Sequence, residues 1–313
     1  MSGGAAAREP TPEVLRNPFL RYFLATRPAF LGITLAGCLL GFAAASAPRW
    51  DLSVPVLLLA VLAHAGVNVL NDYYDHLNGT DAANTARLYP FTGGSRFIQN
   101  GVLTPRRTLA LGLALFAVAI AGGLWLTAQS GPGLFWLGLA GLGIGWAYSA
   151  PPLRLNGRGL GELCVVAGFL GIVVGSAYAL QGGFAPRAWL AGLPYALLVG
   201  NILYLNQFPD RAADRQAGKL HWVARLEPAA AARGYGVILA LAVLSLLGAV
   251  AMGGLPAVCL LALAALPPAL RAARLLARDA ARPERLAPAI RLTLLAAHAQ
   301  AVILALTLFW SAA

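Results

Sequence analysis

Long apolar segments follow one another along the whole chain. A transmembrane helix needs about 20 mostly apolar residues to cross a hydrocarbon core of roughly 30 Å. Segments of about this length can be counted at residues 28–46, 53–73, 107–128, 132–150, 160–180, 186–207, 232–252, 254–271 and 289–311. We therefore expect an all-α integral membrane protein with about nine transmembrane helices.

The composition and the charge pattern agree with a membrane protein. The chain is 59% hydrophobic and 11% charged, whereas an average soluble domain is about 25% charged. Cytoplasmic loops are enriched in Lys and Arg. With a cytoplasmic N-terminus, all of the 23 lysines and arginines except Arg49 and Arg187 fall on the cytoplasmic side. The net charge of +11 is thus explained by topology and by contact with membrane lipids, and it does not indicate a nucleic-acid partner.

We interpret the chain as one domain in the cell (inner) membrane. Residues 1–20 are expected to form a flexible cytoplasmic tail, and residues 21–313 a single transmembrane domain of nine helices.

Two short acidic clusters interrupt this apolar chain. Five of the seven aspartates lie in NDYYDHLNGTD, at residues 71–81, and in NQFPDRAADRQAGK, at residues 206–219. Residues four apart share a face of a helix, so each cluster should present an Asn-x-x-x-Asp row. Both clusters end a predicted span on the cytoplasmic side, which places the expected site at that face.

Carboxylates held this close repel each other, and burial at a membrane boundary adds a desolvation cost. Oxygen ligands without neighbouring His or Cys pairs favour Mg²⁺, which binds through one or two carboxylates together with substrate phosphates. The two clusters therefore predict Mg²⁺ bridging to a diphosphate. Solvated helix-capping groups are the alternative, but a matched pair of clusters on one side of the membrane argues against it.

Basic residues accompany the acids. The planar guanidinium of an arginine can donate two parallel hydrogen bonds to phosphate oxygens, and the ammonium of a lysine supplies a compact positive charge. The same arginines also fit a role in topology and in contact with anionic lipids. Lys219 is the only lysine in the chain, which hints at a chemical role. The candidates for binding a diphosphate are Arg27, Arg87, Arg96, Arg154 and Lys219.

With these motifs, the sequence resembles the UbiA superfamily of intramembrane aromatic prenyltransferases. NDYYDHLNGTD is similar to the first Asn/Asp-rich motif of that family, and NQFPDRAADRQAGK is similar to the second. ATRPAF, PFTGGSRFIQNGVLTP and YSAPPLRLNGRGLGE add to the resemblance, which covers roughly residues 20 to 311. Nine spans are the architecture of that family, and the resemblance implies that the transmembrane helices are arranged around a central cavity.

The resemblance implies Mg²⁺-dependent transfer of a polyprenyl group from an allylic diphosphate to an aromatic acceptor. It implies that metal and diphosphate are held by Asn71, Asp75, Asp81, Asn206, Asp210 and Asp214. Asp72 is either a further ligand or the base that takes the proton of the acceptor, and Tyr148 lies near the reacting carbon. We expect loops 74–106 and 209–231 to cap the cavity on the cytoplasmic side.

The sequence constrains the identity of the acceptor less than it constrains the reaction. TGGSRFIQNG and AGKLHWVARLE are closest in appearance to the branch that prenylates 1,4-dihydroxy-2-naphthoate in menaquinone biosynthesis. In that branch AGK is commonly followed by Arg-Thr or Arg-His, whereas here Leu220 and His221 follow Lys219. The alternatives are another acceptor, namely 4-hydroxybenzoate, haem or a polar lipid head group. The sequence does not reveal the length of the isoprenoid chain or the oligomeric state.

Functions of other classes fit less well. An ion-coupled transporter would need ionisable groups in the interiors of its spans, where almost none occur apart from His64 and His298, and these suit hydrogen-bonded packing. Enzymes that join alcohols to nucleotide-activated lipids carry a different arrangement of aspartates. A purely structural membrane subunit would not explain two matched acidic clusters.

Overall fold

The computed structural model describes residues 8–312, and every regular element in this range is helical. The long helices are α2 (Pro28–Ala44), α3 (Ser53–Leu77), α5 (Pro105–Ser130), α6 (Pro132–Ser149), α7 (Gly161–Gln181), α8 (Pro186–Gln216), α10 (Pro228–Ala251), α11 (Leu266–Asp279) and α12 (Ala287–Ala312). The short helices are α1 (Pro18–Ala25), α4 (Thr80–Ala83) and α9 (Trp222–Arg225), and a 3₁₀ segment, η3 (Ala257–Ala265), leads into α11. Each predicted apolar segment lies on one of the long helices, and the eighth is shared between η3 and α11.

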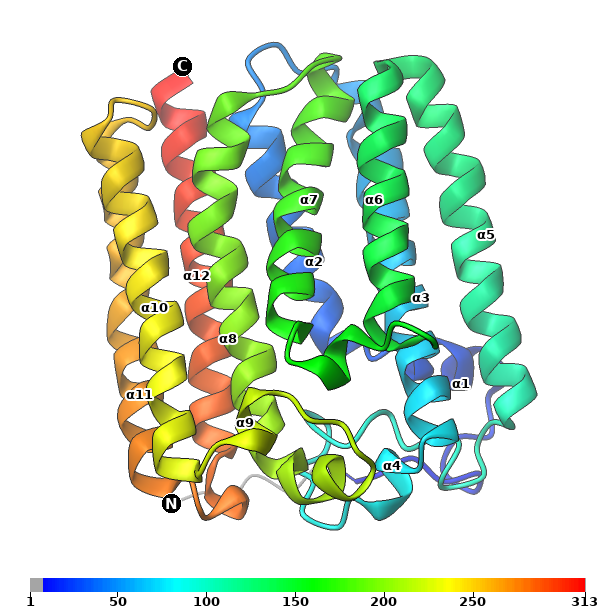
Figure 1. Cartoon of the computed structure of the whole chain (residues 1–313). Coiled ribbons are helices and arrows are strands. Elements are labelled where there is room, and N and C mark those ends of the chain that lie inside the picture. The colour runs from blue at the N-terminus through cyan, green and yellow to red at the C-terminus, as the bar shows by residue number, and fades with distance from the viewer. Residues whose placement is uncertain (1–7, 313) are drawn as a thin grey trace.

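The bundle is that of a multi-pass membrane protein. Among the described residues, seven helices are long and apolar enough to cross a membrane. The pair α1 and α2, bent by 60°, raises this number to eight if it counts as one span. The remaining predicted span is α6, an 18-residue helix that stands in the same bundle (Figure 1) but is not among those seven.

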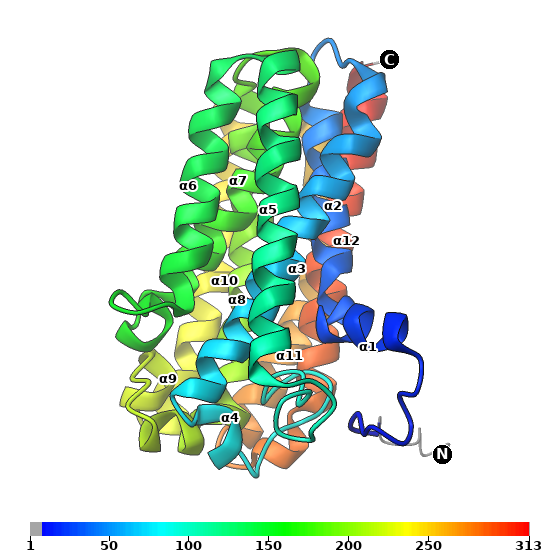
Figure 2. The same cartoon turned by 90° about the vertical axis from the view of Figure 1, so that its right-hand side faces the viewer.

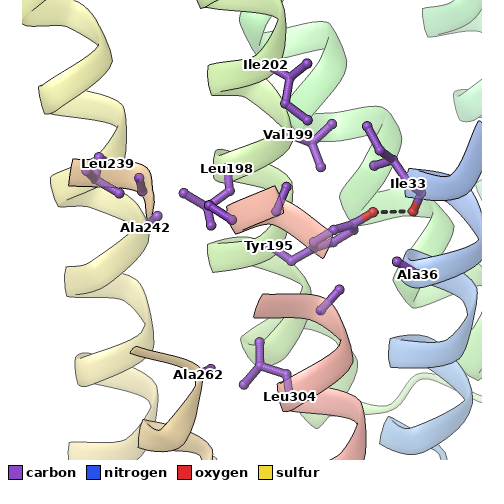
Figure 3. Close-up of a cluster of buried hydrophobic side chains, with 14 of the residues drawn as sticks. Ile33, Ala36, Tyr195, Leu198, Val199, Ile202, Leu239, Ala242, Ala262 and Leu304 are labelled. Carbon is purple, nitrogen blue, oxygen red and sulfur yellow. Dashed lines mark hydrogen bonds between the residues drawn. The ribbon is translucent and has the colours of Figure 1, made fainter. Parts of the chain in front are cut away.

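The core joins helices that are distant in the sequence. Helix α8 packs against α7, α10 and α12, and α2 packs against α7 and α12. The Tyr195 hydroxyl on α8 donates a hydrogen bond to the carbonyl of Ile33 on α2 (Figure 3), with Leu198 and Leu304 close by. A Cβ at Gly41 would collide with the Val173 carbonyl, so α2 and α7 can approach closely only because residue 41 is glycine. Small residues commonly allow such packing between transmembrane helices.

The irregular parts of the chain that matter for function gather at one end of the bundle. Figure 1 shows α4 and α9 together at its lower end, and Figure 2 shows α1 outside the bundle near the same end. We expected a loop from residue 209 onward, and this prediction was wrong for its first turns. Helix α8 continues through Pro209 to Gln216. A proline within a transmembrane helix is tolerated where neighbouring elements support the backbone, and α8 packs against α9 and α10 here.

The N-terminal segment packs against this end. Residues 1–7 of the expected tail lie outside the described residues. Beyond them, Glu9 accepts hydrogen bonds from Arg87, at 2.6 Å, and from Asn100, at 3.1 Å. Leu15 is buried against Phe97. The described part of the segment is therefore held against the loop that follows α4 by hydrogen bonds and apolar contacts.

Candidate active site

A cavity of about 90 Å³ lies between the two acidic clusters. It is bounded by the ends of α3 and α8, by α4, and by the loops that carry Gly93 and Asn156. Its wall includes all six residues predicted to hold metal and diphosphate, namely Asn71, Asp75, Asp81, Asn206, Asp210 and Asp214. Tyr148, Arg27 and Lys219 also line it. The structure thus brings together residues that are more than a hundred positions apart in the chain.

The first cluster begins in the last two turns of α3 and ends in α4. Asn71 donates through Nδ2 to Asp75 Oδ2 at 3.1 Å and to Ser149 Oγ at 2.9 Å. Asn78 donates to the other oxygen of Asp75 at 3.3 Å. Asn71 lies one turn before Asp75 on α3, and Asn78 directly follows the helix, so each oxygen of the Asp75 carboxylate accepts a hydrogen bond from a residue close to it in the sequence.

The second cluster lies on one face of α8, as the four-residue spacing predicts. Asp210 Oδ1 accepts from Asn84 Nδ2 at 2.5 Å, and Asp210 Oδ2 accepts from the Gly93 amide at 3.4 Å. Asn206 donates to the Phe91 carbonyl at 3.4 Å. The loop after α4 therefore closes over α8 through backbone and amide contacts.

Lys219 connects the two clusters. Its Nζ lies 3.1 Å from Asp75 Oδ2 and 3.7 Å from Asp214 Oδ1. Burial lowers the pKa of this ammonium, but the carboxylates of Asp214 and Asp75 outweigh burial and raise the pKa well above its ordinary value. A lysine in this setting remains charged at neutral pH, so it supplies a fixed positive charge between the clusters.

Asp81 follows the Gly79 turn and is buried in α4. Burial raises its pKa well above the ordinary value, and the charges of Asp75 and Asp72 add to this effect. Gly94, at φ +71°, passes so close that a Cβ there would lie 2.5 Å from Asp81 Oδ2. This gathering of carboxylates is costly unless a cation shares the site.

Asp72 stands apart from the other acids. Its Oδ2 accepts from the Ser95 amide at 3.1 Å, and its Oδ1 lies 3.8 Å from Arg27 Nη1. It is buried and does not belong to the cavity wall. Of the predicted acidic residues, it is the one placed behind the wall.

The predicted basic residues divide into two groups. Arg27 and Lys219 line the cavity, whereas Arg87, Arg96 and Arg154 do not. Arg87 binds Glu9 and the Asn84 carbonyl, and the buried Arg96 side chain donates to the Asp81 carbonyl. These arginines hold the loop in place. Arg154 borders a neighbouring hollow that Lys219 and Asn156 also line.

Several wall residues escaped the sequence analysis, namely Thr80, Asn84, Gly93, Gly94, Asn156, Leu203 and Gln207. The paired glycines in PFTGGSRF were a visible signal, because glycine permits a positive φ and close approach of the backbone. Asn84 and Asn156 gave no such signal, since their approach depends on loop geometry.

The donor set fits a divalent cation that is shared with phosphate oxygens. Within residues 8–312, no three His, Cys, Asp or Glu side chains converge closely enough to enclose a metal ion by themselves. However, four buried carboxylate or amide oxygens of wall residues have no hydrogen-bond partner: Asn84 Oδ1, Asn206 Oδ1, Gln207 Oε1 and Asp214 Oδ1. Mg²⁺ takes few protein ligands and completes its shell with water and phosphate. These carboxylate and amide oxygens suit that mode of binding.

Comparison with known proteins agrees with this geometry. A family model described as the UbiA prenyltransferase family matches residues 30–311. The chain is 30% identical over 206 residues to a 1,4-dihydroxy-2-naphthoate octaprenyltransferase of Bacillus subtilis, covering 62% of each chain. It is also 30% identical over 296 residues to the protein of that name in Mycobacterium leprae, covering 92% of this chain and 95% of the relative.

A solved structure has the same fold. A UbiA homologue from Archaeoglobus fulgidus, bound to DMAPP and Mg²⁺, aligns with a TM-score of 0.60 at 16% identity. The alignment covers 91% of this chain and 99% of the homologue.

Proposed function

Because the chain belongs to the UbiA prenyltransferase family and is therefore a prenyltransferase, we propose that it transfers a polyprenyl group from an allylic diphosphate to an aromatic acceptor. We propose 1,4-dihydroxy-2-naphthoate, or a similar quinone precursor, as this acceptor. The names of the relatives in Bacillus subtilis and Mycobacterium leprae support the choice.

One observation carries the proposal. Two acidic clusters, from α3 and α8, meet at a single cavity, and the chain's only lysine bridges them. A protein gains nothing structurally from burying so many carboxylates around a void. A site for a cation and a diphosphate accounts for the acids, the lysine and the unpartnered oxygens together.

In this proposal Asn71, Asp75 and Asp81 hold Mg²⁺ on one side of the cavity, and Asn206, Asp210 and Asp214 hold it on the other. Mg²⁺, when bound, neutralises the charge of the departing diphosphate. Lys219 and Arg27 add positive charge at the wall, where preorganised groups stabilise developing negative charge without rearrangement.

The remaining wall residues keep water from the allylic carbon. Tyr148, Phe91 and Leu203 line the cavity, and aromatic faces can stabilise a developing cation. Asp72 lies behind Gly94 and next to Arg27, and its proposed role is that of the base or of a further metal ligand. Arg87 and Arg96 would reach a diphosphate only by giving up their present partners, and Arg154 would approach it from the neighbouring hollow.

The proposed setting is the cell (inner) membrane, with a cytoplasmic N-terminus and nine spans that include α6. Residues 21–313 then form one transmembrane domain whose cavity opens to the cytoplasm. The charge pattern supports this orientation, since nearly all arginines and Lys219 fall on the side of the acidic clusters.

The proposal is tested with purified protein in nanodiscs. Labelled polyprenyl diphosphate and Mg²⁺ are supplied with each acceptor in turn: dihydroxynaphthoate, 4-hydroxybenzoate, haem and a polar lipid. We expect product with dihydroxynaphthoate that disappears on chelation of Mg²⁺. Product with another acceptor would overturn the acceptor assignment, and no product with any of them would overturn the proposed function.

A further inference from the structure

His221 is a fully buried histidine that the proposed chemistry does not use. It follows Lys219 and Leu220 in the turn that connects α8 to α9. Both of its ring nitrogens are engaged. Nε2 lies 2.8 Å from Asp214 Oδ2, and Nδ1 lies 3.1 Å from the Ala224 amide nitrogen.

The partners determine the protonation of the ring. A backbone N–H can only donate, so Nδ1 must accept the hydrogen bond from Ala224. The ring proton is therefore on Nε2, which donates to Asp214 Oδ2. As a result, one oxygen of Asp214 is already occupied by the protein.

The other oxygen of Asp214 has no hydrogen-bond partner. Oδ1 is buried and lies 3.7 Å from Lys219 Nζ, beyond hydrogen-bonding distance. The backbone of the turn is also anchored to Asp214, because the Lys219 amide donates to the Asp214 carbonyl at 2.8 Å. His221 and the turn thus leave Asp214 one orientation and one available oxygen.

We propose that His221 is a positioning residue that holds the Asp214 carboxylate so that Oδ1 alone is presented to a cation in the cavity. This inference rests on the proposed function, because it assumes that Asp214 binds Mg²⁺. Partners that orient metal ligands in this way commonly change metal affinity by about 10- to 100-fold when they are removed.

A purely structural role is the competing explanation, because His221 also caps the N-terminus of α9. Two substitutions separate the roles. In His221→Asn, the Asn Oδ1 takes the place of Nδ1 and preserves the cap, but no atom reaches Asp214. In His221→Gln, the side-chain amide can reach Asp214 and replace the Nε2 donor, whereas the cap is weakened.

The test measures binding without turnover. Radiolabelled inorganic pyrophosphate is dialysed to equilibrium against protein in nanodiscs over a series of Mg²⁺ concentrations. We expect the Mg²⁺ concentration for half-maximal retention to rise at least about tenfold in His221→Asn, while its melting temperature stays near that of the unchanged protein. His221→Gln should need nearly the unchanged Mg²⁺ concentration despite a lower melting temperature.

A double substitution completes the test. If His221 acts through Asp214, His221→Asn should add little to the effect of Asp214→Asn, because coupled residues are not additive. Equal Mg²⁺ requirements of His221→Asn and the unchanged protein would overturn the inference alone. Failure of the unchanged protein to retain pyrophosphate at any Mg²⁺ concentration would overturn the proposed site, and the inference with it.

Discussion

The Lys219 ammonium lies 3.1 Å from the Asp75 carboxylate, although 144 residues separate the two in the sequence. Asp75 lies in the last turn of α3, and Lys219 follows α8, so this contact joins the two halves of the acidic site. Both side chains are largely buried. The pair therefore provides a direct way to ask whether the cavity works as one unit.

Replacing Lys219 with Met should remove the fixed charge while keeping most of the volume. We expect prenyl transfer to fall about 100-fold or more, the usual effect of deleting one preorganised charge-stabilising group. The folded state should also lose about 3–5 kcal/mol, since Asp75 and Asp214 lose their cation. Kinetics and thermal melting measure the two effects.

Arg215→Met is the matched control for this change. Arg215 lies four residues before Lys219 and is exposed at the end of α8. The Arg215→Met variant should have nearly the activity and the melting temperature of the unchanged protein. An equal loss of activity in the two variants would show that general positive charge at this end, rather than the bridge, sustains the reaction.

Gly94→Ala should disturb the acidic site, because Gly94 lies in the loop after α4 and contacts Asp81. Its φ of +71° belongs to the left-handed region, which costs an alanine about 1–2 kcal/mol. In addition, the new Cβ would lie 2.5 Å from Asp81 Oδ2 and must displace that carboxylate. We expect a lower melting temperature together with a higher Mg²⁺ requirement for activity.

Gly101→Ala separates strain from collision. Gly101 has a similar φ of +70°, but nothing lies within 4 Å of its added Cβ. The Gly101→Ala variant should show a similar backbone strain, and hence a similar loss of stability, without a change in the Mg²⁺ concentration that activity requires. If Gly94→Ala also left the Mg²⁺ requirement unchanged, Asp81 would not belong to the site.

The contact between Glu9 and Arg87 should depend on pH. The hydrogen bond from Arg87 lowers the pKa of Glu9 below its ordinary value of 4.5, although burial opposes this shift. A carboxylate with a lowered pKa stabilises the folded state above its unfolded pKa, and this contribution is lost as pH falls through the folded value. Hydrogen exchange in residues 84–100, measured relative to the intrinsic exchange rate at each pH, should therefore increase at acidic pH.

Glu9→Gln should reproduce that increase at neutral pH and remove the corresponding part of the pH dependence. Exchange in the C-terminal turns of α12, at the end of the bundle opposite α4 and α9 (Figure 1), provides the internal reference. Unchanged exchange in residues 84–100 at neutral pH would mean that Glu9 does not hold this loop.

Local patterns predicted much of the fold and part of the site. Four-residue spacing placed Asn206, Asp210 and Asp214 on one helical face, because helical periodicity is a local property. The position of Arg87 outside the cavity wall could not be predicted, because its partner Glu9 lies 78 residues away in the sequence. Likewise, Asn84 reaches Asp210 across 126 residues through a loop conformation that no periodic pattern encodes.

The central claim is that the two acidic clusters form one Mg²⁺-dependent prenyl-transfer site, and Asp75→Ala and Asp210→Ala test it most directly. Each variant removes one carboxylate from one cluster and leaves the other cluster intact. With labelled polyprenyl diphosphate, dihydroxynaphthoate and Mg²⁺ in nanodiscs, we predict that either variant loses transfer by at least about 100-fold while remaining folded. Transfer at the unchanged rate in either variant would contradict the claim.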